Sequence, residues 1–163
     1  MQVKAAGGAP MEHRPISKRK EHEMKILLAV DGSDYSRRML DYIVQHTSTF
    51  GGDNQFTVLN TVLAVPHRAA AFAGPDVVHT YYADEARTVI DPIRAFLEQH
   101  DIEASYEHKV GHPAGEIARY AEEGKFDMVV MGSHGQNALK NLVLGSVATQ
   151  VLAACSVPVL IVR

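Results

Sequence analysis

Residues 126–147 read FDMVVMGSHGQNALKNLVLGSV: an apolar run, a glycine-containing loop and the start of a second apolar pattern. The run at 126–131 predicts a strand, and residues 146–154 have helical spacing. Gly132, Gly135 and Gly145 lie between or beside them. Glycine lets a backbone approach an anion closely, and a Gly-Ser step that opens a helix directs free N–H groups at it. The stretch therefore predicts a strand, a phosphate-binding loop and a helix.

The same alternation of apolar runs and helical patterns extends from residue 24 to the end of the chain. Apolar runs predict further strands at 25–30, 55–63, 103–110 and 157–162. Helical patterns follow Ser33 or Asp34, either of which can cap the first helix, and recur at 79–99 and 113–123.

Three features interrupt this pattern. Residues 64–78 contain Pro66, Gly74 and Pro75 and are predicted to be an irregular, mobile loop or lid. Pro92 lies within the helix predicted at 79–99 and predicts a kink or a late start. The glycines at 51 and 52, followed by an aspartate, are predicted to break the chain before the second strand.

Alternating strands and helices predict an α/β fold, a five-stranded parallel sheet with helices on both faces and the strand order 3-2-1-4-5. The third strand is the most polar and is expected at an edge. Ligands of such sheets bind beyond the carboxyl ends of the strands, where the strand order reverses. If the first and fourth strands are neighbours, Asp31 and the glycine loop face the same crevice.

Composition excludes several classes of protein. The 163 residues carry a formal net charge of -3, which is unlike the basic surface of a nucleic-acid-binding protein. Cys155 is the one cysteine and cannot form an internal disulfide, which favours a cytoplasmic protein. No run is long enough to span a bilayer. Residues 1–23 are polar and lack periodicity, so they are expected to be a disordered extension, either native or added for expression, of a domain at 24–163.

At this point the sequence resembles the universal stress protein family. The resemblance rests on Gly132-x2-Gly135-x9-Gly145-Ser146, on VDGS at 30–33 and on PVLIVR at 158–163, and it covers residues 24–163. It implies a Rossmann-like domain that binds an adenine nucleotide (ATP, ADP or AMP), usually as a homodimer, in stress response or signalling.

For the nucleoside, the resemblance implies contacts at the ends of the first two strands. Asp31 would lie beside the adenosine and Ala29 would line the ribose side. Thr61 would meet the adenine edge with its backbone; the family generally has an apolar residue there, and Asn60 replaces a common histidine. A backbone contact would survive both changes.

For the ribose and phosphates, the resemblance implies the glycine loop. Gly132, His134 and Gly135 would surround them, while Gly145, Ser146 and Val147 would offer backbone N–H groups to the distal phosphates. Met131 is counted with the nucleotide-binding residues, although its place in an apolar strand also fits a core residue. Amides at a helix N-terminus favour anions. Mg²⁺ would be expected to accompany ATP, with Asp31 holding it indirectly.

Each of these residues also has a simpler interpretation. Asp31 could be a turn or helix-capping residue, His134 a solvated loop histidine, and Ser146 only the N-cap of the helix at 146–154. No cluster of side chains has metal-ligand spacing. The closing strand could be interior, or it could be an edge that pairs with a second copy, and we expect a homodimer through that strand.

Three functions compete at this stage. The first is a nucleotide-binding stress or signalling module with at most slow ATP hydrolysis or autophosphorylation. The second is an ATP pyrophosphatase or adenylating enzyme, whose SGGxDS loop residues 31–36 (DGSDYS) only half resemble. The third is a dimerising member that binds no nucleotide. The glycine spacing argues against the third, on the expectation that no structural demand requires three glycines there.

Overall fold

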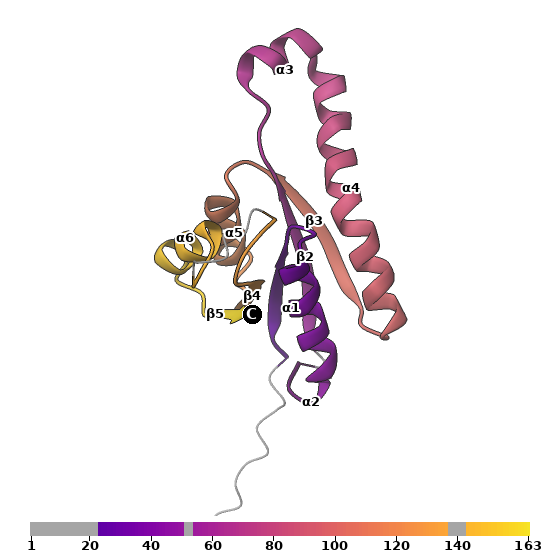
Figure 1. The fold of residues 1–163 in the computed structure, drawn as a ribbon, viewed down its shortest axis with the longest axis vertical. Helices are drawn as coiled ribbons and strands as arrows, with labels where there is room; N and C mark the ends of the chain where they lie inside the picture. The colour runs from indigo at the N-terminus through magenta and orange to yellow at the C-terminus, as the bar shows by residue number, and fades with distance from the viewer. Residues whose placement is uncertain (1–22, 51–53, 137–142) are drawn as a thin grey trace, which may run out of the picture.

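The protein forms one five-stranded parallel sheet with helices on both faces (Figure 1). The computed structural model describes residues 23–50, 54–136 and 143–163. The predicted chain break at 51–53 and most of the predicted extension at 1–23 lie outside the described residues. In chain order the elements are β1 (Lys25–Val30), α1 (Asp34–Gln45), α2 (Thr47–Phe50), β2 (Gln55–Val62), α3 (His67–Ala73), α4 (Pro75–Gln99), β3 (Ala104–Val110), α5 (Pro113–Glu123), β4 (Met128–Gly132), α6 (Ser146–Ala154) and β5 (Val159–Val162).

The strand order is β3-β2-β1-β4-β5, which confirms the predicted 3-2-1-4-5. β1 lies at the centre and pairs with β2 and β4, for example through Ile26 with Phe56 and with Met128. The central strand is buried on both faces, which explains its nearly continuous apolar sequence. β3 forms one edge, as its polar sequence predicted, and β5 forms the other.

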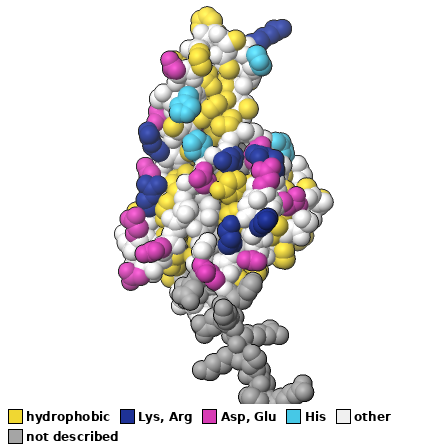
Figure 2. All heavy atoms as spheres, turned by 180° about the vertical axis from the view of Figure 1, so that it is seen from behind, with side chains coloured by type: hydrophobic (Ala, Val, Ile, Leu, Met, Phe, Trp, Pro, Cys, Tyr) yellow, Lys and Arg dark blue, Asp and Glu magenta, His cyan; other side chains and the backbone are white. Residues whose placement is uncertain are grey.

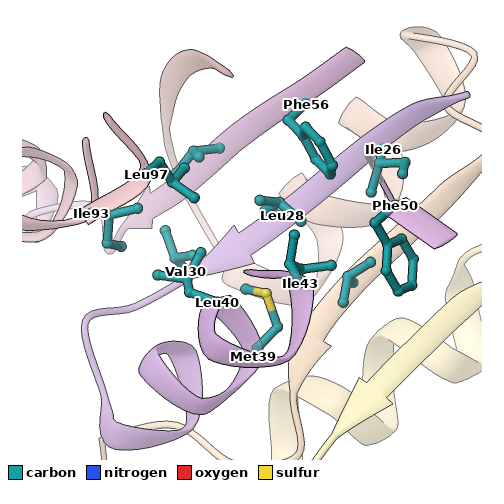
Figure 3. Packing of buried hydrophobic residues seen from close by; sticks show 12 residues of the cluster. Ile26, Leu28, Val30, Met39, Leu40, Ile43, Phe50, Phe56, Ile93 and Leu97 are labelled. Atoms are coloured by element: carbon teal, nitrogen blue, oxygen red, sulfur yellow. The ribbon is translucent and has the colours of Figure 1, made fainter. Parts of the chain in front are cut away.

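One face of the sheet is covered by α1 and α4. Alternate residues of the central strands point toward these helices, and Leu28 and Val30 of β1 meet Met39 and Ile43 of α1 in a cluster that Figure 3 shows from close by. Leu97 of α4 is fully buried in the same cluster. The apolar stripe of each helix, with its three- and four-residue spacing, therefore faces the sheet.

The opposite face is covered by α5 and α6. Leu27 and Ala29, the alternate residues of β1, pack with Ile117 and Ala121 of α5 and with Val151 of α6. Together the two layers of helices hold the carboxyl ends of β1, β2 and β4 at one edge of the sheet, with the helix N-termini around them.

The prediction for residues 64–78 is wrong. The segment contains the helix α3 and the first residues of α4 rather than an irregular loop. Gly74, with a φ of 87°, separates the two helices, and Pro75 occupies the first turn of α4. Proline is favoured there because its missing N–H has no partner in the first turn anyway. The glycine and the prolines therefore mark helix ends rather than a loop.

The predicted late start of the helix at 79–99 is also wrong, since α4 begins at Pro75 and continues through Pro92. Three strands begin later than predicted: β3 at Ala104, β4 at Met128 and β5 at Val159. The short helix α2 was not predicted. Only the ends of these elements shift, so the predicted alternation of strands and helices is confirmed.

α3 and the N-terminal half of α4 form an arm that projects beyond the carboxyl edge of the sheet (Figure 1). Its surface carries exposed apolar side chains, among them Phe72, Val77 and Tyr81, and the back view shows hydrophobic side chains gathered along it (Figure 2). Within the described parts of the chain, none of the helices combines the length and the apolar character needed to cross a bilayer.

Candidate functional site

A cavity of about 590 Å³ opens at the carboxyl edge of the sheet, and we call it the carboxyl-edge cavity. Its volume is in the range of small-molecule sites. It lies where the strand order reverses between β1 and β4, as the topology predicts. The structure brings all ten residues named from the sequence to its wall: Ala29, Asp31, Thr61, Met131, Gly132, His134, Gly135, Gly145, Ser146 and Val147.

Asp31 follows the last residue of β1 and holds two segments together. Its Oδ1 accepts hydrogen bonds from the amide of Ser33, at 3.0 Å, and from the hydroxyl of Ser36, at 2.7 Å. Its Oδ2 accepts the amide of Gln136 at 3.0 Å. The Gln136 side chain also donates to the Asp31 carbonyl at 2.5 Å. The carboxylate therefore ties the start of α1 to the glycine loop.

The N-terminus of α1 is capped by Ser33, and Asp31 is not its N-cap. The Ser33 hydroxyl accepts the Ser36 amide at 3.3 Å, and the Ser33 carbonyl accepts the amide of Arg37. Ser36 is 4% exposed and its hydroxyl also accepts the Asp31 amide at 3.0 Å. Asp31 thus has a structural role in the loop, and its contact with adenosine stays a prediction.

The loop glycines have a structural role, because a side chain would clash at Gly132 and Gly135 and would be tightly packed at Gly145, so the expectation that nothing structural demands them is wrong. A Cβ at Gly132 would lie 2.7 Å from the Cβ of Tyr35, and one at Gly135 would lie 2.7 Å from Asp31 Oδ2. At Gly145 a Cβ would lie 3.1 Å from the Cα of His134. The glycine spacing alone therefore does not distinguish a nucleotide-binding member of this fold from one that binds none.

The N-terminus of α6 faces the carboxyl-edge cavity without a side-chain cap. Gly145, not Ser146, is the N-cap, and among the described residues there is no side-chain cap hydrogen bond at this terminus. The Gly145 amide donates to the Ser133 carbonyl at 2.8 Å, so it is not available to a ligand. The first hydrogen bond within the helix runs from the Thr149 amide to the Gly145 carbonyl. The amides of Ser146 and Val147 therefore lack an acceptor within the helix.

His134 is positioned by its neighbours. Its Nδ1 lies 3.0 Å from the hydroxyl of the fully buried Ser133, and its ring lies 4.9 Å from that of Tyr35, tilted by 40°. Both contacts fix the imidazole at the wall of the carboxyl-edge cavity. His134 is half-buried, so the interpretation as a freely solvated loop residue does not fit.

The end of β2 supplies the wall beside β1. The last pair between the two strands joins Val30 and Asn60, and β2 continues past it through Thr61 and Val62. Asn60 is 4% exposed and donates from Nδ2 to the Val30 carbonyl at 3.0 Å. Asn60 thus ties the ends of β1 and β2 together, and Thr61 extends beyond them into the cavity wall.

Sequence reasoning missed the walls that α4, α5 and the end of the glycine loop contribute. Tyr81, Glu85 and Thr88 of α4 line the carboxyl-edge cavity, as do Ile117 of α5 and Gln136. The spacing of Tyr81, Glu85 and Thr88 at i, i+4 and i+7 could have indicated one helix side. The sequence does not indicate that this side faces the strand ends.

The described wall of the carboxyl-edge cavity contains neither lysine nor arginine. Its charged side chains are the carboxylates of Asp31 and Glu85, together with the titratable imidazole of His134. Lys140, which lies within the glycine signature, is outside the described residues. Among the residues that are described, no three His, Cys, Asp or Glu side chains are placed to hold a metal ion. An anion in this cavity would therefore be bound chiefly by backbone amides.

Comparison with known proteins gives a consistent picture. The family model for the universal stress protein family matches residues 24–163. The stress response protein NhaX of Bacillus subtilis is 30% identical over 87% of this chain and 99% of its own length. The structure of MJ0577 from Methanocaldococcus jannaschii superimposes with a TM-score of 0.72 at 27% identity, over 85% of this chain and 94% of that one.

Two more distant structures share the fold and were solved with nucleotides. One is a universal stress protein in complex with cAMP, with a TM-score of 0.57 at 24% identity over 86% of this chain and 97% of that one. The other is the universal stress protein of Archaeoglobus fulgidus in complex with dAMP, with a TM-score of 0.62 at 20% identity over 86% and 98%.

Proposed function

The chain belongs to the universal stress protein family, and from this premise we propose that its carboxyl-edge cavity binds an adenine nucleotide as part of a stress-response or signalling module. The observation that carries the proposal is the convergence of all ten predicted residues on one cavity. These residues come from β1, β2, β4, α6 and the segments that follow β1 and β4, so no single local motif could bring them together.

We assign the phosphates to the N-terminus of α6. The amides of Ser146 and Val147 have no acceptor within the helix, and both residues line the cavity. A helix N-terminus carries a partial positive charge and favours an anion. The Ser146 hydroxyl adds a further donor. Since the Gly145 amide is held by Ser133, it is not part of this site.

We assign the nucleoside to the ends of β1 and β2. Ala29, Thr61 and Met131 line that part of the cavity, with the loop glycines close to Asp31. The cAMP and dAMP complexes of distant family members support an adenine nucleotide as the ligand class.

The described residues of the cavity do not form a set of oxygen ligands that would bind Mg²⁺ directly. Both oxygens of Asp31 already accept hydrogen bonds, from Ser33 and Ser36 on one side and from Gln136 on the other. The described residues offer no cluster of ligands around it. The expectation that Asp31 holds Mg²⁺ indirectly stays a prediction.

Hydrolysis in this cavity is proposed to be slow. Efficient phosphoryl transfer requires a positioned base or water-orienting group together with cationic stabilisation of the developing charge. The described wall contains no lysine or arginine, and the Asp31 carboxylate already accepts hydrogen bonds from its own loop. We therefore expect ATP turnover near background, and rapid multiple turnover by the purified protein would favour the ATP pyrophosphatase alternative.

The experiment that tests the proposal identifies the ligand directly. Freshly purified protein is denatured, any released nucleotide is identified by mass spectrometry, and the nucleotide-free protein is titrated calorimetrically with AMP, ATP, GMP and adenosine. We expect AMP or ATP to bind more tightly than both adenosine and GMP. If none of the four binds, the proposal is contradicted. The remaining alternative is then a member of the fold that dimerises and binds no nucleotide.

We infer that the free edge of β5 pairs with a second copy of the chain. β5 is an edge strand with the apolar sequence VLIV, hydrogen bonded to β4 on one side. Exposed apolar edges promote association, and pairing across a two-fold axis satisfies them. Sedimentation velocity should show a dimer at micromolar concentration, and Ile161→Pro should weaken it. A wild-type monomer at that concentration would contradict the inference.

A further inference from the structure

The wall that α4 contributes to the carboxyl-edge cavity has a polar and an aromatic component. Tyr81, Glu85 and Thr88 lie on one side of the helix and line the cavity. Further along the same helix Val89 approaches the end of β1, since a Cβ at Gly32 would lie 3.3 Å from Val89 Cγ2. The helix therefore runs beside the ends of β1 and β2, where the nucleoside is proposed to bind.

The two carboxylates of the cavity differ in what they already bind. Asp31 accepts two hydrogen bonds at Oδ1 and one at Oδ2 from its own loop and from the glycine loop. The Glu85 carboxylate makes no hydrogen bond or ion pair with any described residue, and the Thr88 hydroxyl donates to the Glu85 backbone carbonyl rather than to the carboxylate. Glu85 is thus the cavity carboxylate that remains available to a ligand.

The surroundings of Glu85 indicate what that ligand group must be. The described wall has no lysine or arginine to neutralise Glu85. A phosphate would be repelled by it, whereas a hydroxyl or amino group would donate to it. A carboxylate has two oxygens, and vicinal hydroxyls can donate to both; in dinucleotide-binding folds a ribose hydroxyl donates to an acidic residue in this way.

An apolar surface lies beside this carboxylate. Leu63, the residue after β2, is 65% exposed, and Tyr81, one turn before Glu85, is 45% exposed; both line the cavity. The Val65 amide donates to the Tyr82 hydroxyl at 2.8 Å, which joins the segment after β2 to α4. An aromatic ring held at a cavity mouth suits a planar base.

We propose that α4 is the nucleoside-recognising wall of the cavity, in which Glu85 accepts hydrogen bonds from the ribose hydroxyls and Tyr81 contacts the base. The proposal rests on nucleotide binding as the proposed function and adds a specificity determinant to it. It assigns the discrimination between ribose and deoxyribose to a helix that no predicted site residue occupies.

The test compares AMP with dAMP in calorimetric titrations of the wild-type protein and Glu85→Ala. We expect the wild-type protein to prefer AMP by about tenfold, because a hydrogen bond to a charged acceptor is lost with the 2′-hydroxyl. Glu85→Ala should bind both nucleotides alike. Glu98→Gln, at an exposed site on the same helix that does not line the cavity, should keep the wild-type preference.

Tyr81→Ala separates the base contact from the ribose contact. This variant should bind AMP and dAMP more weakly by the same factor, about tenfold, because stacking on the base does not involve the 2′-hydroxyl. Thermal unfolding of the nucleotide-free variants should match the wild-type protein, since Tyr81 and Glu85 are both exposed.

The binding of AMP and dAMP by the wild-type protein distinguishes a wrong role for Glu85 from a wrong proposed function. A wild-type protein that binds neither AMP nor dAMP contradicts nucleotide binding itself. A wild-type protein that binds both equally, or a Glu85→Ala variant that keeps the preference for AMP, overturns the assignment of Glu85 while leaving nucleotide binding intact.

Discussion

The N-termini of α1 and α6 lie at the same edge of the sheet, follow adjacent strands and are used differently. At α1, Ser33 caps the helix by accepting the Ser36 amide, and the Ser36 hydroxyl donates to Asp31. At α6 the N-cap is Gly145, which has no side-chain acceptor, and the first-turn amides face the cavity.

The comparison separates a structural helix terminus from one that is available to a ligand. A capped terminus stabilises the fold without a ligand, whereas an uncapped one leaves donors whose best partner is an anion. The glycine loop joins the two, because the amide of Gln136 donates to Asp31 while the amide of Gly145 donates to Ser133. Substitutions at the α1 side should therefore change stability, and substitutions at the α6 side should change affinity.

The largest effect is expected for Gly132→Val. The new side chain would begin 2.7 Å from Tyr35 Cβ in a fully packed region, so we expect the free energy of unfolding to fall by about 2–3 kcal/mol. Urea denaturation measures it. Gly115→Ala, in α5 with open space around it, is the control and should stabilise by about 0.5 kcal/mol. Equal stability of Gly132→Val and the wild-type protein would show that the loop is not tightly packed.

Asp31→Ala should lower the stability of the nucleotide-free protein by about 2 kcal/mol, because the hydroxyl of buried Ser36 and two loop amides lose their acceptor. Thermal and urea unfolding without ligand measure it. Asp34→Ala, which removes an exposed carboxylate from the first turn of α1, should cost less than about 1 kcal/mol. If the two variants are equally stable, Asp31 does not tie the loops together.

The strands and the glycine loop could be predicted because their signals are local. β1 and β4 are continuous apolar runs, and the glycines stand out by spacing. The reason for Gly135 could not be predicted, since its partner Asp31 lies far away in the sequence and approaches it only through the pairing of β1 with β4. Gly74 and Pro75 were misinterpreted because the same residues mark loops and helix ends.

The α4 wall could not be predicted for a different reason. Tyr81 and Glu85 occupy exposed positions of an amphipathic helix, where such residues are ordinarily solvated. Their place beside a cavity depends on how α4 packs past the ends of β1 and β2, where Val89 approaches Gly32. Local sequence patterns carry no information on that packing.

The smallest expected effect lies at the other end of α6. Hydrogen bonds from the Ser156 amide and hydroxyl lower the pKa of the Glu122 carboxyl below its ordinary value. A lowered pKa in the folded state means that this stabilisation is present above the ordinary pKa and is lost as the pH falls through the lowered one. Ser156→Ala should raise the pKa part of the way back, measured by NMR titration, and Ser156→Thr should leave it low. An unchanged pKa in Ser156→Ala would contradict the role of the hydroxyl.

The central claim is that the free amides of α6 bind the nucleotide phosphate, and proline tests it most directly because it removes an amide while fitting the first helical position. Ser146→Pro and Asp34→Pro place it at equivalent positions of α6 and α1. In calorimetric titrations with AMP, Ser146→Pro should bind about tenfold more weakly than Ser146→Ala, which lacks only the hydroxyl, while Asp34→Pro binds like the wild-type protein. Circular dichroism should show that both proline variants remain folded. Equal binding by Ser146→Pro and Ser146→Ala, or equal weakening by both prolines, would contradict the account.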